Sequence, residues 1–177
     1  SGYMLTPTVR RTLAPRGQTP LQNAWDRHDR ISVISALTIS PVRRRLGLYF
    51  PWLPTDANAT GEDVVCFLDK LDYHIGDHFT VVWDGHRIHD RAKVVRAHLA
   101  RHRGIWSERF PSYAPELNPD EQVWTHTKYG RLANFAPMDI DHLRRKLHYE
   151  LRRLQRRPDL LASFIRHTKL PIKIPAR

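Results

Sequence analysis

The chain has 177 residues, which suits one domain with its own core, and its apolar content of 41% is that of an ordinary globular protein. With 29 Lys and Arg against 18 Asp and Glu, its net charge of +11 favours a polyanionic partner, although a solubilising surface explains that charge equally well. One cysteine excludes an internal disulfide and a thiolate zinc cluster, and no stretch approaches the roughly 20 apolar residues of a membrane span.

No signal-peptide pattern opens the sequence, so we expect a soluble protein of a reducing compartment. The first thirty residues alternate weakly and contain Pro and Gly, which predicts short strands or an extended arm. The β-branched run "ISVISALTI" (31–39) predicts a strand buried on both faces. "LGLYF" (46–50) follows a turn that contains Pro41, and we expect it to be the hairpin partner of that strand.

The middle of the chain alternates helix and strand. In "TGEDVVCFLDKL" (60–71), Thr60 is the expected N-cap and apolar residues follow at helical spacing. Cys66 lies in this run and is expected to be a buried small hydrophobe. A strand is predicted at 78–84 and another at 104–110, on either side of a basic helix at 87–103.

The last third is predicted to be helical. One helix begins near Pro119, a second spans 138–157 and a short third lies at 159–167, before a basic, Pro-rich tail. Five apolar residues of the second helix are expected to face inward: Ile140, Leu143, Leu147, Leu151 and Leu154. The predicted elements begin with strands, continue with alternating helices and strands, and end with helices. This order indicates an α/β fold with a mixed sheet flanked by helices.

Asp84 ends an apolar strand in "VVWDGHRIH". Ligands of open α/β sheets gather outside the carboxyl ends of strands, so a carboxylate there is well placed for function. A turn aspartate or a helix N-cap is an equally good interpretation of Asp84. The eleven histidines are scattered and show no compact metal-ligand pattern.

A second acidic feature is "LNPDEQVW" (117–124). Asn118 as N-cap, Pro119 at N1 and Glu121 at N3 form a plausible capping box, and Asp120 complements the helix dipole. This local explanation leaves Glu121 free to point at Asp84. Two carboxylates in a basic protein suggest Mg²⁺, and a pair of such ions can cleave or join phosphodiesters.

"FPSYAPELNPDEQVWTHTKY" resembles the "LPPYSPxLNPIExxWxxxK" signature of DDE transposases in the mariner-related branch of bacterial insertion sequences. "VVWDGHRIHDRAKVV" is similar to that family's "DNxxxH" segment, and "RRTLAPRGQTP" is similar to "RTWxPRGxxP". The match follows the family's order from about residue 3 to about residue 133. The first of these segments is specific, whereas the other two are weak by themselves.

The resemblance implies a ribonuclease H-like fold that binds two Mg²⁺ (or Mn²⁺) ions, cuts DNA at transposon ends and joins the 3′ end to a target. Three acids hold the ions in that family: one Asp on the first strand, another on the fourth, and a Glu or Asp on a later helix. By position, Asp84 is the second acid and Glu121 the third. Asp120 falls on a usually apolar position, so we interpret it as first-turn charge.

Further residues receive roles from the same alignment. His89 matches the family histidine and would orient a carboxylate or contact phosphate, with a surface histidine an equal alternative. Asn118 is a candidate for similar contacts, and Gly85 replaces the usual Asn. Basic residues expected to hold the DNA backbone are Arg87, Arg91, Lys93 and Lys128.

In the family the first Asp lies in a "DE(S/T)G" stretch just before the segment that matches Gly2 onward. We therefore expect this sequence to lack that Asp and much of the first strand, since Asp26 and Asp29 cannot replace it by alignment. Such a chain would bind divalent metal weakly and show little or no strand transfer. A neighbouring strand edge would then be open to pairing with another chain.

Together these features predict a C-terminal catalytic-core portion of a transposase, with the core at 1–135 and a helical extension and basic tail at 136–177. Its expected partner is double-stranded DNA, as transposon ends and target, with a homodimer left open and no membrane. The expected location is the bacterial cytoplasm, associated with the nucleoid. The alternatives are a non-catalytic DNA-binding remnant of a transposase and a dimerisation module built on the helix at 138–157.

Overall fold

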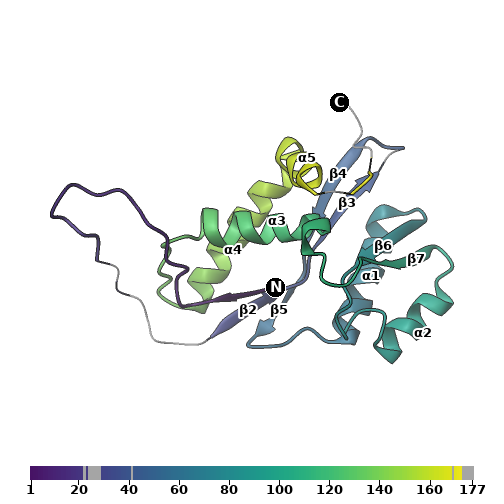
Figure 1. Cartoon of the computed structure of the whole chain (residues 1–177). Helices are drawn as coiled ribbons and strands as arrows, with labels where there is room; N and C mark the ends of the chain where they lie inside the picture. Colours follow the sequence, from purple (N-terminus) through teal and green to yellow (C-terminus); the bar gives the residue numbers. More distant parts are fainter. Residues whose placement is uncertain (22, 24–28, 41, 169, 173–177) are drawn as a thin grey trace.

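The computed structural model describes residues 1–21, 23, 29–40, 42–168 and 170–172 (Figure 1). Asp26, Pro41 and the end of the basic tail, from residue 173, lie outside the described residues. The described strands form three small sheets. The first is antiparallel, with the order β1 (Gly2–Met4), β2 (Arg30–Val33) and β5 (Trp52–Thr55). The second is the hairpin of β3 (Ala36–Ser40) and β4 (Arg45–Tyr49), and the third is the parallel pair of β6 (Phe79–Trp83) and β7 (Ile105–Arg109).

The run predicted as one strand at 31–39 is two strands. β2 ends at Val33 and pairs with β1 and β5, whereas β3 begins at Ala36 and pairs with β4. Ile31 and Val33 are buried, but every residue of β3 is only half-buried, so burial on both faces holds for β2 alone. The predicted hairpin is confirmed, with Ala36 opposite Tyr49 and Ser40 opposite Arg45.

Helix α1 (Gly61–Ile75) begins where the sequence predicts. Thr60 Oγ1 accepts from the Asp63 N–H, and the Asp63 carboxylate accepts from the Thr60 N–H at 2.9 Å, which completes a capping box. The helix ends at Gly76, whose φ of 62° suits glycine. Cys66 is exposed, contrary to the prediction, because it lies on the opposite face of the helix from Val64 and Phe67, which are buried.

Helix α2 (Lys93–Arg101) is shorter than the predicted helix at 87–103. Residues 87–92 are mostly turn, and Ala92 caps the helix in an extended conformation. Two contacts hold this turn: the Asp84 carboxylate accepts from the His86 N–H at 2.9 Å, and Arg109 of β7 pairs with Asp90. The prediction was wrong here because the local Asp84–His86 hydrogen bond and the tertiary Arg109–Asp90 ion pair override helix propensity.

The C-terminal helices match the sequence pattern. A short 3₁₀ turn, η1 (Pro115–Leu117), leads into α3 (Pro119–Thr125), which continues as the π-helical segment η2 (His126–Arg131). α4 (Ile140–Gln155) and α5 (Pro158–His167) follow. Within the described residues, no helix combines the length and apolar character needed to cross a membrane.

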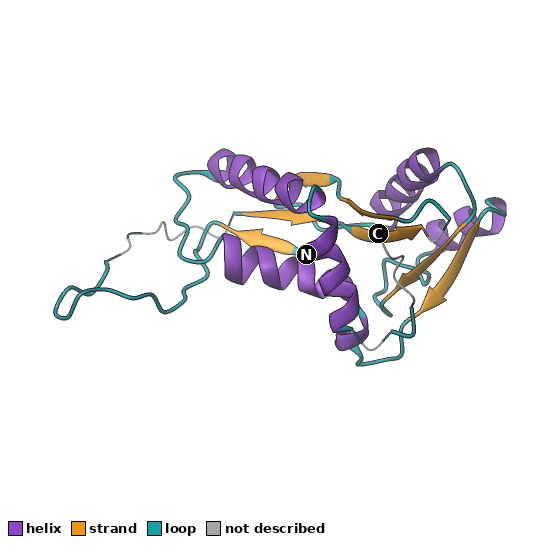
Figure 2. Ribbon diagram, turned by 90° about the horizontal axis from the view of Figure 1, so that it is seen from above, coloured by secondary structure: helices purple, strands orange, loops and turns teal. Residues whose placement is uncertain are grey.

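Two hydrophobic cores hold these elements. The larger core joins β1, β2 and β4 to α3, α4 and α5, and its residues include the four predicted leucines of α4. The smaller core joins α1 and α2 to β6 and β7 through Val64, Leu68, Trp83, Val95 and Ile105. In Figure 2 the β6–β7 pair and its two helices occupy one end of the molecule, and the loop after β1 projects from the other. This loop is the extended arm predicted for the N-terminal region.

Candidate active site

A cavity of about 1520 Å³ lies between the two cores. Strand residues of β2, β3 and β6 and the apolar face of α1 line much of it. Polar residues from distant parts of the sequence are among those that line it, including Ser1, Asp84, His86, His89, Asn118, Asp120 and Glu121. The structure thus brings the two predicted catalytic acids, 37 positions apart, to one surface.

Asp84 follows β6 at the edge of this cavity and is exposed. His89 Nδ1 lies 2.7 Å from Asp84 Oδ1, and the His89 ring stacks on Trp83 with a centroid distance of 5.2 Å and an interplanar angle of 1°. Trp83 therefore supports one face of the imidazole while its nitrogen contacts the carboxylate. Of the two interpretations of His89, this geometry corresponds to the one in which it orients a carboxylate.

Glu121 lies in the first turn of α3, and Asn118 is the N-cap. Asn118 Oδ1 accepts from the Asp120 N–H at 3.1 Å, and the Asn118 N–H donates to the Pro115 carbonyl at 3.0 Å. Because the Pro115 carbonyl already takes the N–H that a capping box would offer, the cap does not require the Glu121 carboxylate. That carboxylate is exposed at the cavity.

Asp120 differs from the first-turn charge expected of it. One carboxylate oxygen accepts from the Ser35 hydroxyl, and the other is buried with no hydrogen-bond partner among the described residues. Burial raises the pKa of Asp120 to about 6, and the charge of Glu121 adds to the increase, while the Ser35 hydrogen bond and the Ser1 amino group oppose it. The sequence carried no signal for this, since Ser35 lies 85 positions away in the β2–β3 connection.

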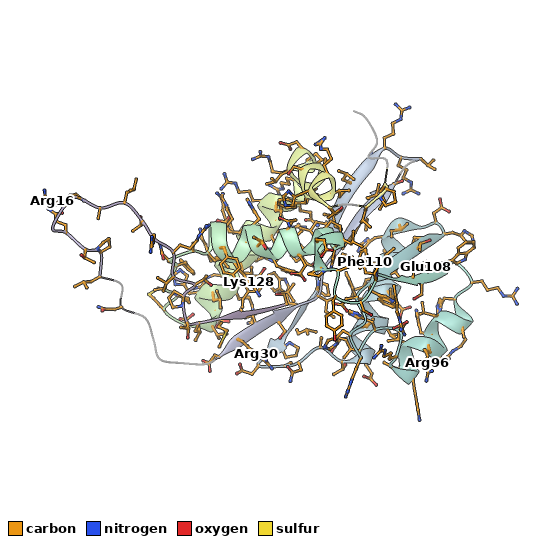
Figure 3. The ribbon with its side chains drawn as sticks, viewed as in Figure 1. Arg16, Arg30, Arg96, Glu108, Phe110 and Lys128 are labelled. Carbon is orange, nitrogen blue, oxygen red and sulfur yellow. The ribbon has the colours of Figure 1, made fainter. Side chains whose placement is uncertain are left out.

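Lys128 extends from η2 (Figure 3), and its charge interacts with that of Glu121. Its ammonium lies 5.2 Å from the centre of the Tyr3 ring. Burial lowers the pKa of Lys128, and the negative charge of Glu121 partly opposes this. Lys128 is therefore a half-buried neighbour of the acids. The other predicted DNA contacts are exposed between β6 and the first turn of α2: Arg87, Arg91 and Lys93.

The donor set fits a hard divalent cation. Asp84 and Glu121 offer exposed carboxylates, and Asp120 adds a buried oxygen that lacks a partner. All three negative charges act on the amino group of Ser1, so they share one electrostatic environment. Mg²⁺ and Mn²⁺ prefer such carboxylate oxygens, with water and phosphate oxygens completing the coordination.

Structural comparison finds a similar fold in solved transposase complexes. The Mos1 strand transfer complex aligns with a TM-score of 0.59 and 13% identity over 96% of this chain and 53% of that chain. The Mos1 transposase paired-end complex with left transposon end and the Mos1 mariner paired-end complex with Mn each align with a TM-score of 0.60 and 13% identity, over 96% of this chain and 54% of theirs. At this identity the likeness shows the fold.

The chain spans about half the length of these Mos1 chains. A comparison with curated protein sequences found no match. A family model described as DDE superfamily endonuclease matches residues 1–144. The predicted resemblance and the mixed α/β, ribonuclease H-like fold are therefore confirmed, and the chain belongs to the DDE superfamily endonuclease family.

Proposed function

We propose that this chain is a catalytic-core portion of a transposase that cleaves DNA at transposon ends and transfers the strand to a target, in a metal-dependent reaction. The observation that carries the proposal is the meeting of Asp84, from the end of β6, with Glu121, from the start of α3, at one cavity. Membership of the DDE endonuclease family supports it. So does the likeness to complexes that hold a transposon end.

Asp84 and Glu121 would hold the metal. Bound Mg²⁺ or Mn²⁺ supplies Lewis acidity toward the phosphodiester and its attacking and leaving oxygens. His89, whose ring stacks on Trp83, holds the Asp84 carboxylate in place through its Nδ1 atom. The exposed Arg87, Arg91 and Lys93 are placed to neutralise DNA phosphates, with Lys128 closer to the acids.

The 177 residues supply two of the three family acids, so we expect this chain, tested alone, to bind metal weakly and to join strands poorly. The exposed basic residues beside α2 favour a second candidate, a DNA-binding remnant without catalysis. The two candidates differ in what the acids do. In a remnant, Asp84→Ala and Glu121→Ala leave DNA affinity unchanged or slightly higher, and that affinity does not depend on metal.

A longer version of the chain, extended upstream through a strand that carries an Asp, tests the function. We expect it to nick a transposon-end duplex with Mn²⁺. Loss of even an outer partner of a metal ligand costs about 10–100-fold, so Asp84→Asn and Glu121→Gln should each lower the rate by at least about 100-fold. Asp120→Asn then shows whether the buried acid is also a ligand.

The matched control is Glu116→Gln, which neutralises an exposed acid of η1 just before α3. Its rate should equal that of the unsubstituted protein. Full activity of Glu121→Gln would contradict the proposal. A cytoplasmic, nucleoid-associated location in a bacterial cell and double-stranded DNA as partner belong to the same proposal, together with the division into a core at 1–135 and a helical extension at 136–177.

A further inference from the structure

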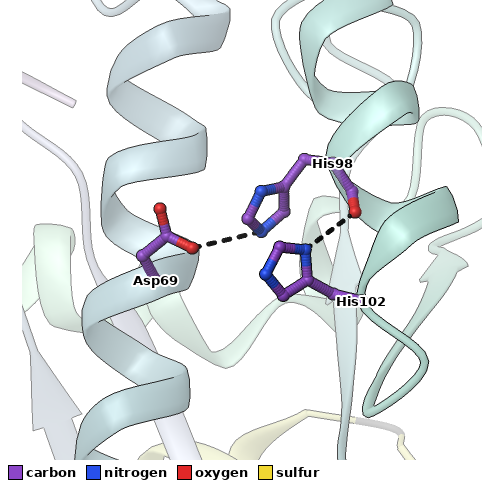
Figure 4. Close-up of side chains that lie close together, drawn as sticks. All are labelled: Asp69, His98 and His102. Carbon is purple, nitrogen blue, oxygen red and sulfur yellow. Dashed lines mark hydrogen bonds and ion pairs between the residues drawn. The ribbon is translucent and has the colours of Figure 1, made fainter.

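A second cluster of metal-ligating side chains lies away from the carboxylates, between α1 and α2. Asp69 comes from α1, His98 from α2, and His102 is the residue that caps the end of α2 (Figure 4). One ligand atom from each residue lies within 4.8 Å of the other two. None of the three lines the cavity that holds Asp84 and Glu121.

His98 is the buried member. Its side chain is 8% exposed, and its Nε2 lies 3.5 Å from Asp69 Oδ1 without a hydrogen-bond partner among the described residues. Burial and the neighbouring His102 lower the pKa of His98, while Asp69 and Asp72 oppose the decrease and Arg101 adds to it. A neutral imidazole that points an unsatisfied nitrogen at a carboxylate is well suited to bind a cation.

The Nδ1 atom of His102 fixes the orientation of its ring. Nδ1 lies 3.0 Å from the His98 carbonyl, to which it can only donate, so the neutral ring keeps a lone pair on Nε2. Figure 4 shows this second nitrogen on the side of the ring that faces Asp69. The two imidazoles stack with centroids 3.9 Å apart, as the i, i+4 spacing on one helix face allows. The helical spacing and the contact with the His98 carbonyl therefore bring the Nε2 atoms of His98 and His102 close together.

Two imidazoles and one carboxylate form a ligand set that zinc uses when one position stays open. Zinc bonds of about 2.0–2.1 Å place tetrahedral ligand atoms about 3.4 Å apart. The separations here reach at most 4.8 Å, so metal binding requires the ligand atoms to move closer together and the stacked rings to turn until both lone pairs point at the ion. Imidazole nitrogens favour zinc and its neighbours over Mg²⁺, which prefers oxygen.

We propose that Asp69, His98 and His102 bind one zinc-type transition-metal ion, which ties α1 to α2. The ion would be separate from the metal of the DNA reaction, in ligand chemistry as well as in place. Its effect would be structural, because α1 and α2 flank the smaller core and the ion would cross-link them. The proposal does not rest on the proposed function, and either one can fail alone.

A cobalt titration tests the site. Metal-free protein is prepared by chelation and titrated with Co²⁺, whose visible spectrum reports tetrahedral coordination, and Zn²⁺ should then displace the signal. We expect one ion per chain. Asp69→Asn and His102→Gln replace residues that are at least partly exposed, so the fold should persist by circular dichroism, and each should weaken binding by at least about 10-fold.

Matched controls separate this site from other ligands. His167→Gln changes an exposed histidine of α5, and Asp77→Asn changes an exposed aspartate that pairs with His78. Both should give the tetrahedral Co²⁺ signal with the same affinity as the unsubstituted chain. Zn²⁺ at one hundred times its Kd should raise Tm by at least about 5 °C, and the same concentration of Mg²⁺ should not.

Three results would overturn the proposal. The first is unchanged affinity in both Asp69→Asn and His102→Gln. The second is a Co²⁺ spectrum without tetrahedral features. The third is a Tm increase that Mg²⁺ reproduces or that Glu121→Gln removes, since either places the ion at the carboxylate cavity.

Discussion

The two cores hold their elements with unequal amounts of buried apolar surface. The larger core has fourteen buried residues among those that the structure describes, including Leu147, Leu151 and Leu161. The smaller core has five buried residues within the described part of the chain, and its strands leave Val82 and Trp106 exposed. Buried apolar area sets most of the favourable free energy, so we expect the smaller core to open more readily.

This difference matters for the candidate active site because its acids come from both regions. Asp84 follows β6 of the smaller core, whereas Glu121 and Asp120 lie on α3, which packs into the larger core. The distance between the acids therefore depends on how firmly the less stable region is held against the more stable one. The α1–α2 cluster of Asp69, His98 and His102 would support the weaker side.

The largest effect is expected in the larger core. Leu151→Ala removes a fully buried side chain of α4 and should lower the free energy of unfolding by about 3–5 kcal/mol, measured by urea denaturation. Tyr149→Ala on the exposed face of the same helix is the control and should cost far less. A loss below about 1 kcal/mol for Leu151→Ala would show that this core is not the stable region.

The next largest effect on stability is expected at Asp120, where the two regions meet. The Asp120 pKa is raised from 3.8 to about 6, so its contribution to stability is fully present below pH 3.8 and is lost as the pH rises through about 6. The ionised form would cost up to about 3 kcal/mol, which Asp120→Asn removes. Thermal unfolding without divalent metal should show the variant more stable at pH 8 and equal near pH 3.

Glu121→Gln is the control for this measurement, because Glu121 is the exposed neighbour of Asp120. It should change stability little at either pH. A gain for Asp120→Asn that is the same at pH 3 and pH 8 would contradict the assignment to a buried charge.

A smaller loss of unfolding free energy is expected for a substitution in the smaller core. Val95→Ala deletes fully buried methyl groups and should cost about 2 kcal/mol. Hydrogen exchange should accelerate in α1, α2, β6 and β7 while α4 and α5 stay protected. Val42→Ala, at a position 87% exposed, controls for residue type. Equal acceleration in α4 would mean that the two regions unfold together.

The smallest effect concerns the start of α1. Thr60→Ala removes the side chain that caps the helix and should cost about 1 kcal/mol by thermal unfolding. Thr12→Ala, exposed in the extended loop, should be neutral. If Thr60→Ala is also neutral, the capping box does not limit the stability of the smaller core.

Local patterns predicted several elements well. The spacing of apolar residues in α4, the cap at Thr60, the β3–β4 hairpin and the start of α3 at Asn118 all depend on residues within a few positions. Predictions that depended on distant neighbours were less accurate. The exposure of Cys66 and the short α2 show this, since what packs on each face decides them.

The α1–α2 cluster is an instructive case. His98 and His102 have an i, i+4 spacing that is visible in "HLARH", yet the histidines of the sequence form no compact metal-ligand pattern. Two histidines at that spacing are common on any helix face. The third residue, Asp69, comes from another helix 29 positions earlier, so only the packing of α1 on α2 assembles the cluster.

By itself, the sequence determined the element types, the resemblance to DDE transposases and the choice of Asp84 and Glu121, because each is written in short-range spacing or in a contiguous motif. Tertiary structure alone decided that the Asp120 carboxyl is buried against Ser35, that Trp83 supports His89, and that Asp69 meets two histidines. Burial, pKa and the meeting of side chains depend on contacts across the fold, which no local pattern encodes.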